Sequence, residues 1–400
     1  MSSYVPVDIQ INILKRLPIK TIVRCTAVCK SWYSIIKNQH LQKPDIKLPS
    51  SSILIMSFEL RNDYQNNCLL LSQDAYDLRE TFEFNYMSID QSEGLYNTGS
   101  WCNGVRCLSQ YHEGQLLCRR KLLLFNPSIR KLRPLPLSSL DDRIEFLGRK
   151  SGRYVGFGYD KVTDDYKVIK LYRICKGIRS DSILHESETW MFDVDLEAEV
   201  YSLKTHSWKT IEVNDHRYFS GHPVSVNNSV HWLCNEDDGL GRASIIAFDF
   251  SSEAFREIML PIECCCRRLF LFLYKGSLAL LETAEVLDEN FSDELDGDLE
   301  DVLEEAQAEE ERNEEMQTVT LWIMKEYGEK VSWSMEFTRK PHISFDFPIN
   351  FTENGKLILQ IHDKEHVAWD PETDQVVNLV SIPTDGEITA EDYMESLLLL

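Results

Sequence analysis

The sequence lacks the short motifs that mark several large classes of enzyme. It contains no G-x-S-x-G nucleophile motif and no G-x-x-x-x-G-K-[ST] phosphate-binding loop. Gly156-Phe157-Gly158 lacks the third glycine and the following helix of a dinucleotide-binding loop, which indicates a strand end. No nucleophile with a partner base and no acid pair stands out elsewhere. We therefore predict no catalytic residues and no cofactor.

Basic charge is also scarce. The 42 Lys and Arg residues face 65 Asp and Glu residues, so the formal net charge is −23. Between Glu282 and Glu315 there are seventeen acidic residues and one basic residue, so this segment alone carries −16 and the remainder −7. No basic stripe exists that could replace the counterions of nucleic-acid phosphates. Nucleic-acid binding is therefore disfavoured.

Long apolar runs and a disulfide framework are missing as well. The apolar run Arg268–Tyr274 is too short to span a bilayer, and Lys275-Gly276 ends it. The eleven cysteines are odd in number and show no framework of regular spacings. The polar start MSSYVPVDIQ contains no secretion signal. We expect reduced thiols, no membrane partner, and a location in the cytoplasm, with the nucleus as a further compartment.

Two patterns have a metal-binding or reactive interpretation and a simpler one. The run His362-Asp363-Lys364-Glu365-His366 matches the HxxEH pattern of inverted zinc proteases, which requires both histidines on one helical face. Here the five residues join two strand-like runs, so a hairpin loop is favoured. The thiols of Cys264–Cys266 are better explained as buried strand residues than as a reactive cluster. The sequence therefore predicts no metal site.

The first forty residues are the part of the chain with helical spacing. Their apolar sets are Ile9, Ile13 and Leu14; Ile22, Val23, Ala27 and Val28; and Trp32, Ile35 and Ile36. Pro6 and Asp8 are start signals for the first helix, and Leu17-Pro18 ends it. Three short helices cannot bury their own apolar faces. They either cap the domain that follows or dock on a partner.

One family pattern runs in register through this segment. Its residues are Val5-Pro6, Asp8-Ile9, Ile13-Leu14, Arg16-Leu17-Pro18, Lys20, Ile22, Arg24, Val28-Cys29-Lys30, Trp32 and Ile35. The pattern resembles the F-box, a helical motif that binds the small adaptor subunit of cullin-type ubiquitin ligases, although Val5 replaces the usual leucine. The resemblance implies that Trp32 is mostly internal packing. It implies adaptor contacts by Val5, Pro6, Ile9, Ile13, Leu14, Leu17, Pro18 and Ile22.

From Gly99 onward a two-part unit recurs. Its first part is a tight turn before an apolar strand, seen at Asn103-Gly104, Asn227-Asn228, Lys275-Gly276 and Asn354-Gly355. Its second part is a strand with an aromatic residue, and alignment gives Phe125, Tyr201, Phe248, Trp322 and Trp369. The interval is 47 residues from Tyr201 to Phe248 and again from Trp322 to Trp369. The interval of 76 residues from Phe125 to Tyr201 suggests two short units.

Repeats of roughly 40–50 residues built only from short strands are typical of β-propellers. We therefore predict an α+β chain in which a small all-α head precedes an all-β, kelch-like propeller of six or seven blades. Two sandwich domains are the competing architecture. Trp208, Trp232 and Trp369 lie at repeat positions and are predicted to be blade core rather than a ligand platform.

The predicted domain boundaries follow these changes of pattern. The head takes residues 1–44, residues 45–98 form a linker and the first strands, and residues 99–400 form the propeller, with an acidic insertion at 282–315. Composition favours a solvated loop for this insertion. The alternative is an electrostatic contact for a basic partner. The candidate residues for that contact are Asp288, Glu289, Asp293, Glu294, Asp296 and Asp298.

Further motifs lie in the strand region. They include Leu124-Phe125-Asn126-Pro127, Phe157-Gly158-Tyr159-Asp160, Asp165-Tyr166-Lys167-Val168, Val230-His231-Trp232-Leu233 and Ile246-Ala247-Phe248-Asp249. These motifs resemble the plant F-box-associated domain, whose copies follow an F-box. The closing Tyr393-Met394-Glu395-Ser396-Leu397 is similar to the end of S-locus F-box proteins.

Together the resemblances imply a non-catalytic substrate receptor of an SCF-type cullin–RING ubiquitin ligase. Its head would bind a Skp-type adaptor, and through it the cullin and RING subunits. Its propeller would hold a target protein for ubiquitination and proteasomal degradation. One alternative within this class is an S-locus-type receptor that recognises basic self-incompatibility ribonucleases in pollen. The alternative from another class, a hydrolase built on the propeller, lacks an identifiable nucleophile.

Overall fold

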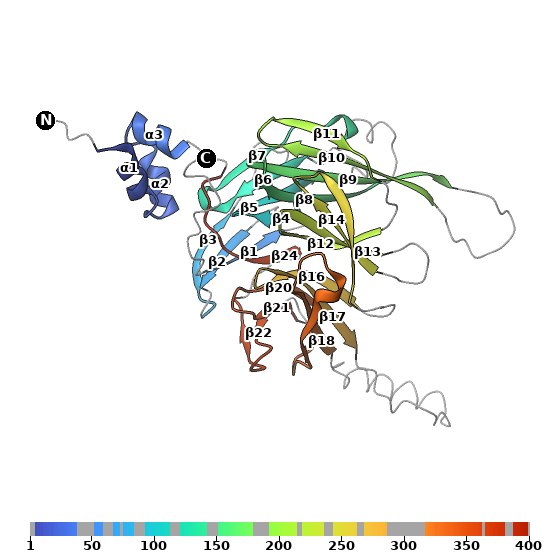
Figure 1. Cartoon of the computed structure of the whole chain (residues 1–400). Coiled ribbons are helices and arrows are strands. Elements are labelled where there is room, and N and C mark those ends of the chain that lie inside the picture. The colour runs from blue at the N-terminus through green and yellow to red at the C-terminus, as the bar shows by residue number, and fades with distance from the viewer. Residues whose placement is uncertain are drawn as a thin grey trace, which may run out of the picture.

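The computed structural model describes residues 5–37, 52–58, 67–72, 75–83, 93–112, 121–141, 151–178, 192–213, 218–235, 243–261, 268–285, 317–361, 365–380 and 387–398. Within these residues, three helices form a small head and six four-stranded antiparallel sheets form a ring (Figure 1). The predicted propeller is confirmed, and of the six or seven blades expected the structure has six. The alternative of two sandwich domains is wrong.

The head consists of α1 (Val7–Leu14), α2 (Ile19–Cys25) and α3 (Lys30–Lys37). Pro6 and Pro18 occupy the N-cap positions of α1 and α2, where extended backbone turns into helix and the missing proline N–H is not needed. The buried core of the head comprises Leu14, Ile19, Ile22, Cys25, Ile35, Ile36 and, from the far end of the chain, Leu397. No helix in the described part of the chain is long and apolar enough to cross a membrane.

The propeller strands follow one another in simple up-and-down order. The first three sheets, from the axis outward, are β24 (Glu387–Asp392), β1 (Ser52–Phe58), β2 (Asn67–Ser72) and β3 (Leu78–Glu83); β4 (Glu93–Cys102), β5 (Val105–His112), β6 (Leu122–Asn126) and β7 (Lys131–Pro134); and β8 (Ser151–Asp160), β9 (Asp165–Ile178), β10 (Phe192–Ser202) and β11 (Ser207–Ile211). The other three are β12 (Tyr218–Val226), β13 (Ser229–Asn235), β14 (Ala243–Asp249) and β15 (Ala254–Met259); β16 (Arg268–Tyr274), β17 (Ser277–Glu285), β18 (Gln317–Met324) and β19 (Trp333–Arg339); and β20 (Phe347–Phe351), β21 (Leu357–Gln360), β22 (His366–Trp369) and β23 (Val376–Asn378).

The ring is closed by the two ends of the chain. The last strand, β24, pairs with β1 in antiparallel register, with Ile55 opposite Ala390. This pairing removes an open sheet edge, which a propeller must otherwise protect. The strands before residue 99 are therefore a blade of the propeller, and the predicted boundary at 98/99 falls inside β4. The repeat pattern placed the boundary too late because it detects the first hairpin turn, which lies at Asn103-Gly104.

The aligned aromatic residues occupy one structural position. Phe125, Tyr201, Phe248, Trp322 and Trp369 lie in β6, β10, β14, β18 and β22, the third strands of five successive sheets. Four of these residues are buried between blades, and the fifth, Trp322, is half-buried. The interval from Phe125 to Tyr201 holds one blade rather than two, because β9 has 14 residues and β10 has 11. Trp232 and Trp369 are buried blade core as predicted, and Trp208 is half-buried.

The predicted tight turns join the innermost strand of a blade to its second strand. Both residues of Asn103-Gly104, Asn227-Asn228 and Lys275-Gly276 have positive φ, between 48° and 81°, as a type I′ hairpin turn requires. In Asn354-Gly355 only the glycine, with φ 82°, has that conformation. The repeat of turn chemistry in the sequence therefore reflects a repeat of backbone geometry.

The acidic segment connects β17 to β18 of a single blade, as predicted. Strand β17 runs to Glu285, so the first four residues of the expected insertion at 282–315 are strand residues. Glu282 is 3% exposed, and its carboxylate accepts a hydrogen bond from the indole N–H of Trp322 at 3.3 Å. Residues 286–316 lie outside the described residues, and all six candidate acidic residues are among them. Their predicted contact with a basic partner stays a prediction.

Candidate functional site

The head presents an apolar face to solvent. On α1 the side chains of Ile9 and Ile13 are 50% and 45% exposed, and they lie four residues apart on one side of the helix. Val5 is 41% exposed, and Pro6 and Pro18 are exposed as well. A contiguous set of exposed apolar side chains on a small module is typical of a protein-binding surface. We call Val5, Pro6, Ile9, Ile13 and Pro18 the exposed head face.

Two of the eight predicted adaptor contacts lie inside the head instead. Leu14 is 0% exposed and Ile22 is 4% exposed, and both belong to the core that joins the three helices. Leu17 is half-buried against the same core, as is Trp32, for which packing was predicted. Leu14 follows Ile13 directly and so lies about 100° around the helix, on the opposite side of the apolar stripe. The pattern of apolar residues alone did not separate these two sides.

Sequence reasoning also missed exposed apolar residues of the head. Val7 is 42% exposed at the start of α1, Val28 is 64% exposed before α3, and Tyr33 is 49% exposed on α3. Val28 belongs to the family pattern but was not assigned to the adaptor. The sequence did mark Val7 as part of the apolar pattern, since Val7 lies next to Pro6 and one helical turn before the apolar Ile11.

The head contacts the propeller through α2. Leu397 enters the head core, and Ile129 of the 3₁₀ turn η1 (Pro127–Ile129) packs at its margin. The N–H of Ile19 donates to the Glu395 carboxylate at 3.4 Å. Glu80 of β3 forms ion pairs with Lys20 of α2 and with Arg130. Hydrogen bonding from Lys20 is the main cause that lowers the pKa of Glu80 below its ordinary value.

The C-terminal tail, residues 393–398, forms the link between the head and the ring (Figure 1). The Asn126 side chain donates to the carbonyls of Ser396 and Leu398 at 2.9 and 2.7 Å. Ser128 Oγ accepts from the N–H of Ser396 at 2.9 Å. Gly104, with φ +73°, is needed here because a Cβ atom would lie 2.3 Å from the Met394 carbonyl oxygen. The Asn126-Pro127 motif of the sequence therefore holds the tail.

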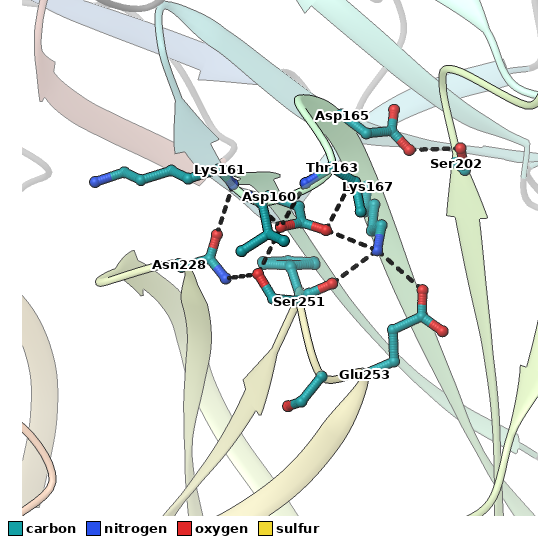
Figure 2. Close-up of polar contacts among 12 residues, drawn as sticks. Asp160, Lys161, Thr163, Asp165, Lys167, Ser202, Asn228, Ser251 and Glu253 are labelled. Carbon is teal, nitrogen blue, oxygen red and sulfur yellow. Dashed lines mark hydrogen bonds and ion pairs between the residues drawn. The ribbon is translucent and has the colours of Figure 1, made fainter.

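A second motif forms a polar clamp between neighbouring blades (Figure 2). Lys167 of β9 lies 3.0 Å from the Asp160 carboxylate and 2.9 Å from the Glu253 carboxylate, and donates to the Phe250 carbonyl at 2.8 Å. Asp160 also accepts hydrogen bonds from the hydroxyls of Ser251 and Thr163. We call Asp160, Lys167, Ser251 and Glu253 the blade clamp, because it ties the β8–β9 hairpin to the β14–β15 turn.

Electrostatics support a structural role for the clamp. Burial by itself raises the pKa of Asp160, but hydrogen bonds from Ser251, Thr163 and Lys167 outweigh it and lower the pKa to about 2. Burial by itself lowers the pKa of Lys167, but the hydrogen bonds that its ammonium donates to Glu253 and Asp160 outweigh burial and raise the pKa. Within the clamp the two carboxylates share the Lys167 ammonium, and Lys209 pairs with Glu253 at 2.6 Å from outside it. The motif residues Asp160 and Lys167 therefore stabilise the contact between two blades.

The other sequence patterns resolve into packing. A Cβ atom on Gly158 would lie 2.1 Å from the Phe250 ring, so Gly158 permits close approach of blades, as expected for a strand rather than a nucleotide loop. His366 begins β22 and pairs with Gln360 of β21, so this part of the HxxEH run lies in a strand. His362, Asp363, Lys364 and Cys264–Cys266 lie outside the described residues. In the described part of the chain, no group of three or more His, Cys, Asp or Glu residues is placed to hold a metal ion.

Two family patterns match the chain at these features. The pattern described as "F-box associated beta propeller domain" matches residues 68–395, and the pattern "F-box domain" matches residues 3–43. The chain belongs to the F-box proteins with an F-box-associated propeller. The exposed head face lies within the F-box match, and the blade clamp and residues 393–395 of the tail lie within the propeller match.

Curated relatives agree with this assignment. The F-box protein CPR1 of Arabidopsis thaliana is 27% identical over 99% of this chain and 89% of its own length. An F-box/kelch-repeat protein of the same plant is 22% identical over 82% of this chain and 78% of its own length. Among solved structures, TolB from Acinetobacter baumannii aligns with a TM-score of 0.46 at 9% identity, over 90% of this chain and 69% of that protein. This last likeness is too low to bear on function.

Proposed function

We propose that this F-box protein is a substrate receptor of an SCF-type ubiquitin ligase, and that the exposed head face binds a Skp-type adaptor. The observation that carries the proposal is that Ile9 and Ile13 stay half-exposed on an otherwise packed head whose sequence matches the F-box pattern. Apolar anchors at the centre of an interface supply most of its affinity. The cullin and RING subunits join through the adaptor, and this chain contributes proximity rather than catalysis.

The strand order supports a target site at the end of the ring away from the head. In the five blades made of consecutive strands, the turns from first to second strand and from third to fourth strand lie at one end of the ring. This end includes Asn103-Gly104 and η1 beside the head. The connections from second to third strand lie at the opposite end of the ring. They begin, for example, after Ile178 of β9 and after Glu285 of β17. A target bound there faces away from the adaptor. Binding residues are commonly carried on such connections.

The adaptor test uses the full chain with Ile9→Asp and Ile13→Asp combined. Two charges at the centre of an apolar interface would lower the affinity for a purified Skp-type adaptor by at least tenfold, measured by calorimetry. Val331→Asp is the matched control, since Val331 is 92% exposed on the propeller. It should bind like the unmodified chain. Unchanged affinity of the double variant, with native circular dichroism, would contradict the docking proposal.

The target test combines capture with reconstitution. Affinity capture with the proteasome blocked supplies candidates, identified by mass spectrometry. A candidate counts as a target only if the reconstituted ligase ubiquitinates it with the unmodified chain and not with the Ile9/Ile13 double variant. If no captured protein meets that condition, the receptor proposal is contradicted even when the adaptor binds.

The S-locus-type alternative concerns the identity of the target. Its support is the similarity of Tyr393–Leu397 to the end of such proteins, together with the acidic segment, which suits a basic ribonuclease. Deletion of residues 287–314 should then weaken ribonuclease binding most at low salt, where charges are least screened. An affinity that the deletion leaves unchanged at every salt concentration counts against it.

A further inference from the structure

Two adjoining cavities lie along the propeller axis, where the innermost strands of the blades line them. The inner chamber, of about 420 Å³, is lined mainly by β12, β16, β20 and β24. The turn-side chamber, of about 850 Å³, is lined by the hairpin turns Asn103-Gly104 and Asn227-Asn228, with aromatic side chains of Tyr159, Phe250 and Phe351. The residues that line both chambers are Trp101, Ser225, Leu273, Asn350 and Glu391. The two chambers therefore adjoin, and the turn-side chamber lies toward the head end of the ring.

The inner chamber has the composition of a ligand site. Its wall is mostly apolar and includes Leu269, Phe270, Leu271, Phe272, Phe347 and Ile349. Phe347 is 53% exposed and Leu273 is 41% exposed, so large apolar surface is left open along the axis. Cavities of roughly 300–1,000 Å³ with apolar walls and a few polar groups are the usual sites of small molecules.

Glu391 is the polar group at the junction of the chambers. Its side chain comes from β24 and is 29% exposed, and it lines both cavities. One carboxylate oxygen accepts from the Asn350 amide at 2.8 Å. The other lies 3.7 Å from Arg106 Nη1, which donates at 2.9 Å to the Thr389 hydroxyl instead. This carboxylate therefore has one close donor within the described residues and accessible oxygen surface, whereas a buried carboxylate is normally stabilised by several donors.

The charged groups around Glu391 leave the junction acidic. Arg106 is 3% exposed and stacks over the Trp101 ring at 5.3 Å, so its guanidinium is held back in the wall. Asp392 follows Glu391 on β24, and Asp164 and Lys161 stand in the turn-side chamber. His222 of β12 lines the inner chamber. Among the described residues that line the chambers, three carboxylates thus face Lys161, the withdrawn Arg106 and one histidine.

We propose that the axial chambers bind a small organic cation, with an apolar body in the inner chamber and an ammonium group on Glu391. The ammonium would supply the strong donor that the second carboxylate oxygen lacks, as a charge-assisted hydrogen bond. Aromatic side chains near the junction, such as Trp101, favour a cation as well. An anion would be repelled by the carboxylates, and a neutral molecule would leave the charge uncompensated. Neither F-box docking nor target ubiquitination requires this site.

Protonation makes the proposal testable. Burial raises the pKa of Glu391 to about 7 and that of Asp392 to about 6. An ammonium binds the ionised carboxylate, whose fraction rises about tenfold between pH 6 and pH 8 for a pKa near 7. Affinity for an amine should therefore rise about tenfold over that range. A neutral alcohol of the same shape should show no such rise.

The experiment is calorimetry on the full chain. The probes are three phenylalkylamines, with two, three or four methylenes between ring and nitrogen, and the three alcohols of matching length. We expect saturable binding of at least one amine, with the alcohol at least tenfold weaker and the tenfold rise from pH 6 to pH 8 for the amine alone. Equal affinities for amine and alcohol would overturn the proposal. Failure of all three amines to bind would overturn it too, since the chambers would then hold water only.

Variants locate the binding. Glu391→Gln should remove the difference between amine and alcohol and the pH dependence, while the exposed, matched carboxylate variant Glu329→Gln should keep both. Leu273→Trp fills the junction without changing charge and should abolish binding. Asp392 and His222 are present in all of these proteins, so a tenfold pH dependence that persists in Glu391→Gln would assign the effect to another group and contradict the proposal.

Discussion

The blade clamp holds a buried carboxylate and the axial junction a half-buried one, and the two carboxylates behave in opposite ways. Asp160 is 0% exposed, receives donors from Ser251, Thr163 and Lys167, and its pKa falls to about 2. Glu391 is 29% exposed, has the Asn350 amide as its close donor, and burial raises its pKa to about 7. Both belong to the propeller and both have a basic side chain nearby.

The difference shows that the number and distance of donors, rather than burial alone, decide what a buried carboxylate does. Lys167 lies within 3.0 Å of Asp160, but Arg106 stays 3.7 Å from Glu391 and bonds to Thr389. The clamp is thus complete within the chain and acts in stability. Among the described residues the Glu391 carboxylate has one close donor, and such an incompletely satisfied carboxylate is the property expected of a binding site. The predictions below test this contrast.

The largest effect should follow from Lys167→Met. This substitution leaves Asp160 and Glu253 without their shared cation, and removal of one member of a buried ion pair costs about 3–5 kcal/mol. The free energy of unfolding, measured by denaturant titration, should fall by that amount. The control is Lys161→Met, because Lys161 is an exposed lysine in the turn between β8 and β9. It should change the free energy of unfolding by less than about 0.5 kcal/mol. Equal losses in both variants would mean that the clamp is not a special contact.

The pH dependence of stability should have opposite sign at the two carboxylates. The pKa of Glu391 is about 7 in the folded chain, above its ordinary value of 4.5, so its contribution is present at low pH and is lost as pH rises through 7. The unmodified chain should therefore lose about 2 kcal/mol of unfolding free energy between pH 5 and pH 8 relative to Glu391→Gln. Asp160, with its lowered pKa, instead loses its contribution as pH falls from 4 toward 2. Parallel pH profiles of the two proteins between pH 5 and 8 would refute the assignment for Glu391.

The smallest effect should follow from Glu80→Gln at the contact between head and ring. Glu80 pairs with Lys20 and Arg130, but both cations are more than half exposed, and exposed ion pairs contribute about 0–1 kcal/mol. Thermal unfolding should therefore change little, and less still at high salt. A loss comparable with that of Lys167→Met would show that the head contact is cooperative with the propeller core.

The fold was largely readable from the sequence because its signals are local. The start signal Pro6 before α1, and tight-turn pairs such as Asn103-Gly104, act over two to four residues, and the helix start and the turns lie where predicted. Blade number was not readable to better than six or seven. Strand length varies, and the long β9 and β10 made one blade look like two.

The site was only partly readable, because exposure depends on what a side chain packs against. Ile13 and Leu14 are neighbours with the same apolar character, yet Ile13 is 45% exposed and Leu14 is 0% exposed. Helical periodicity assigns both residues to the apolar side of the helix and does not say which part of that side is covered. The position of α2, α3 and the tail residue Leu397 decides which of them is covered.

By itself the sequence determined the two-part organisation of this protein, the F-box pattern, the repeat of turns and aromatic strands, and the position of the acidic segment. All of these depend on residues close together in the chain. Only the tertiary structure decided that β24 closes the first blade, that the tail joins the head, and that Glu391 meets Arg106 and Asn350 on the axis. Residues 106 and 391 lie far apart in sequence. No local pattern predicts their meeting, which requires the ring to close.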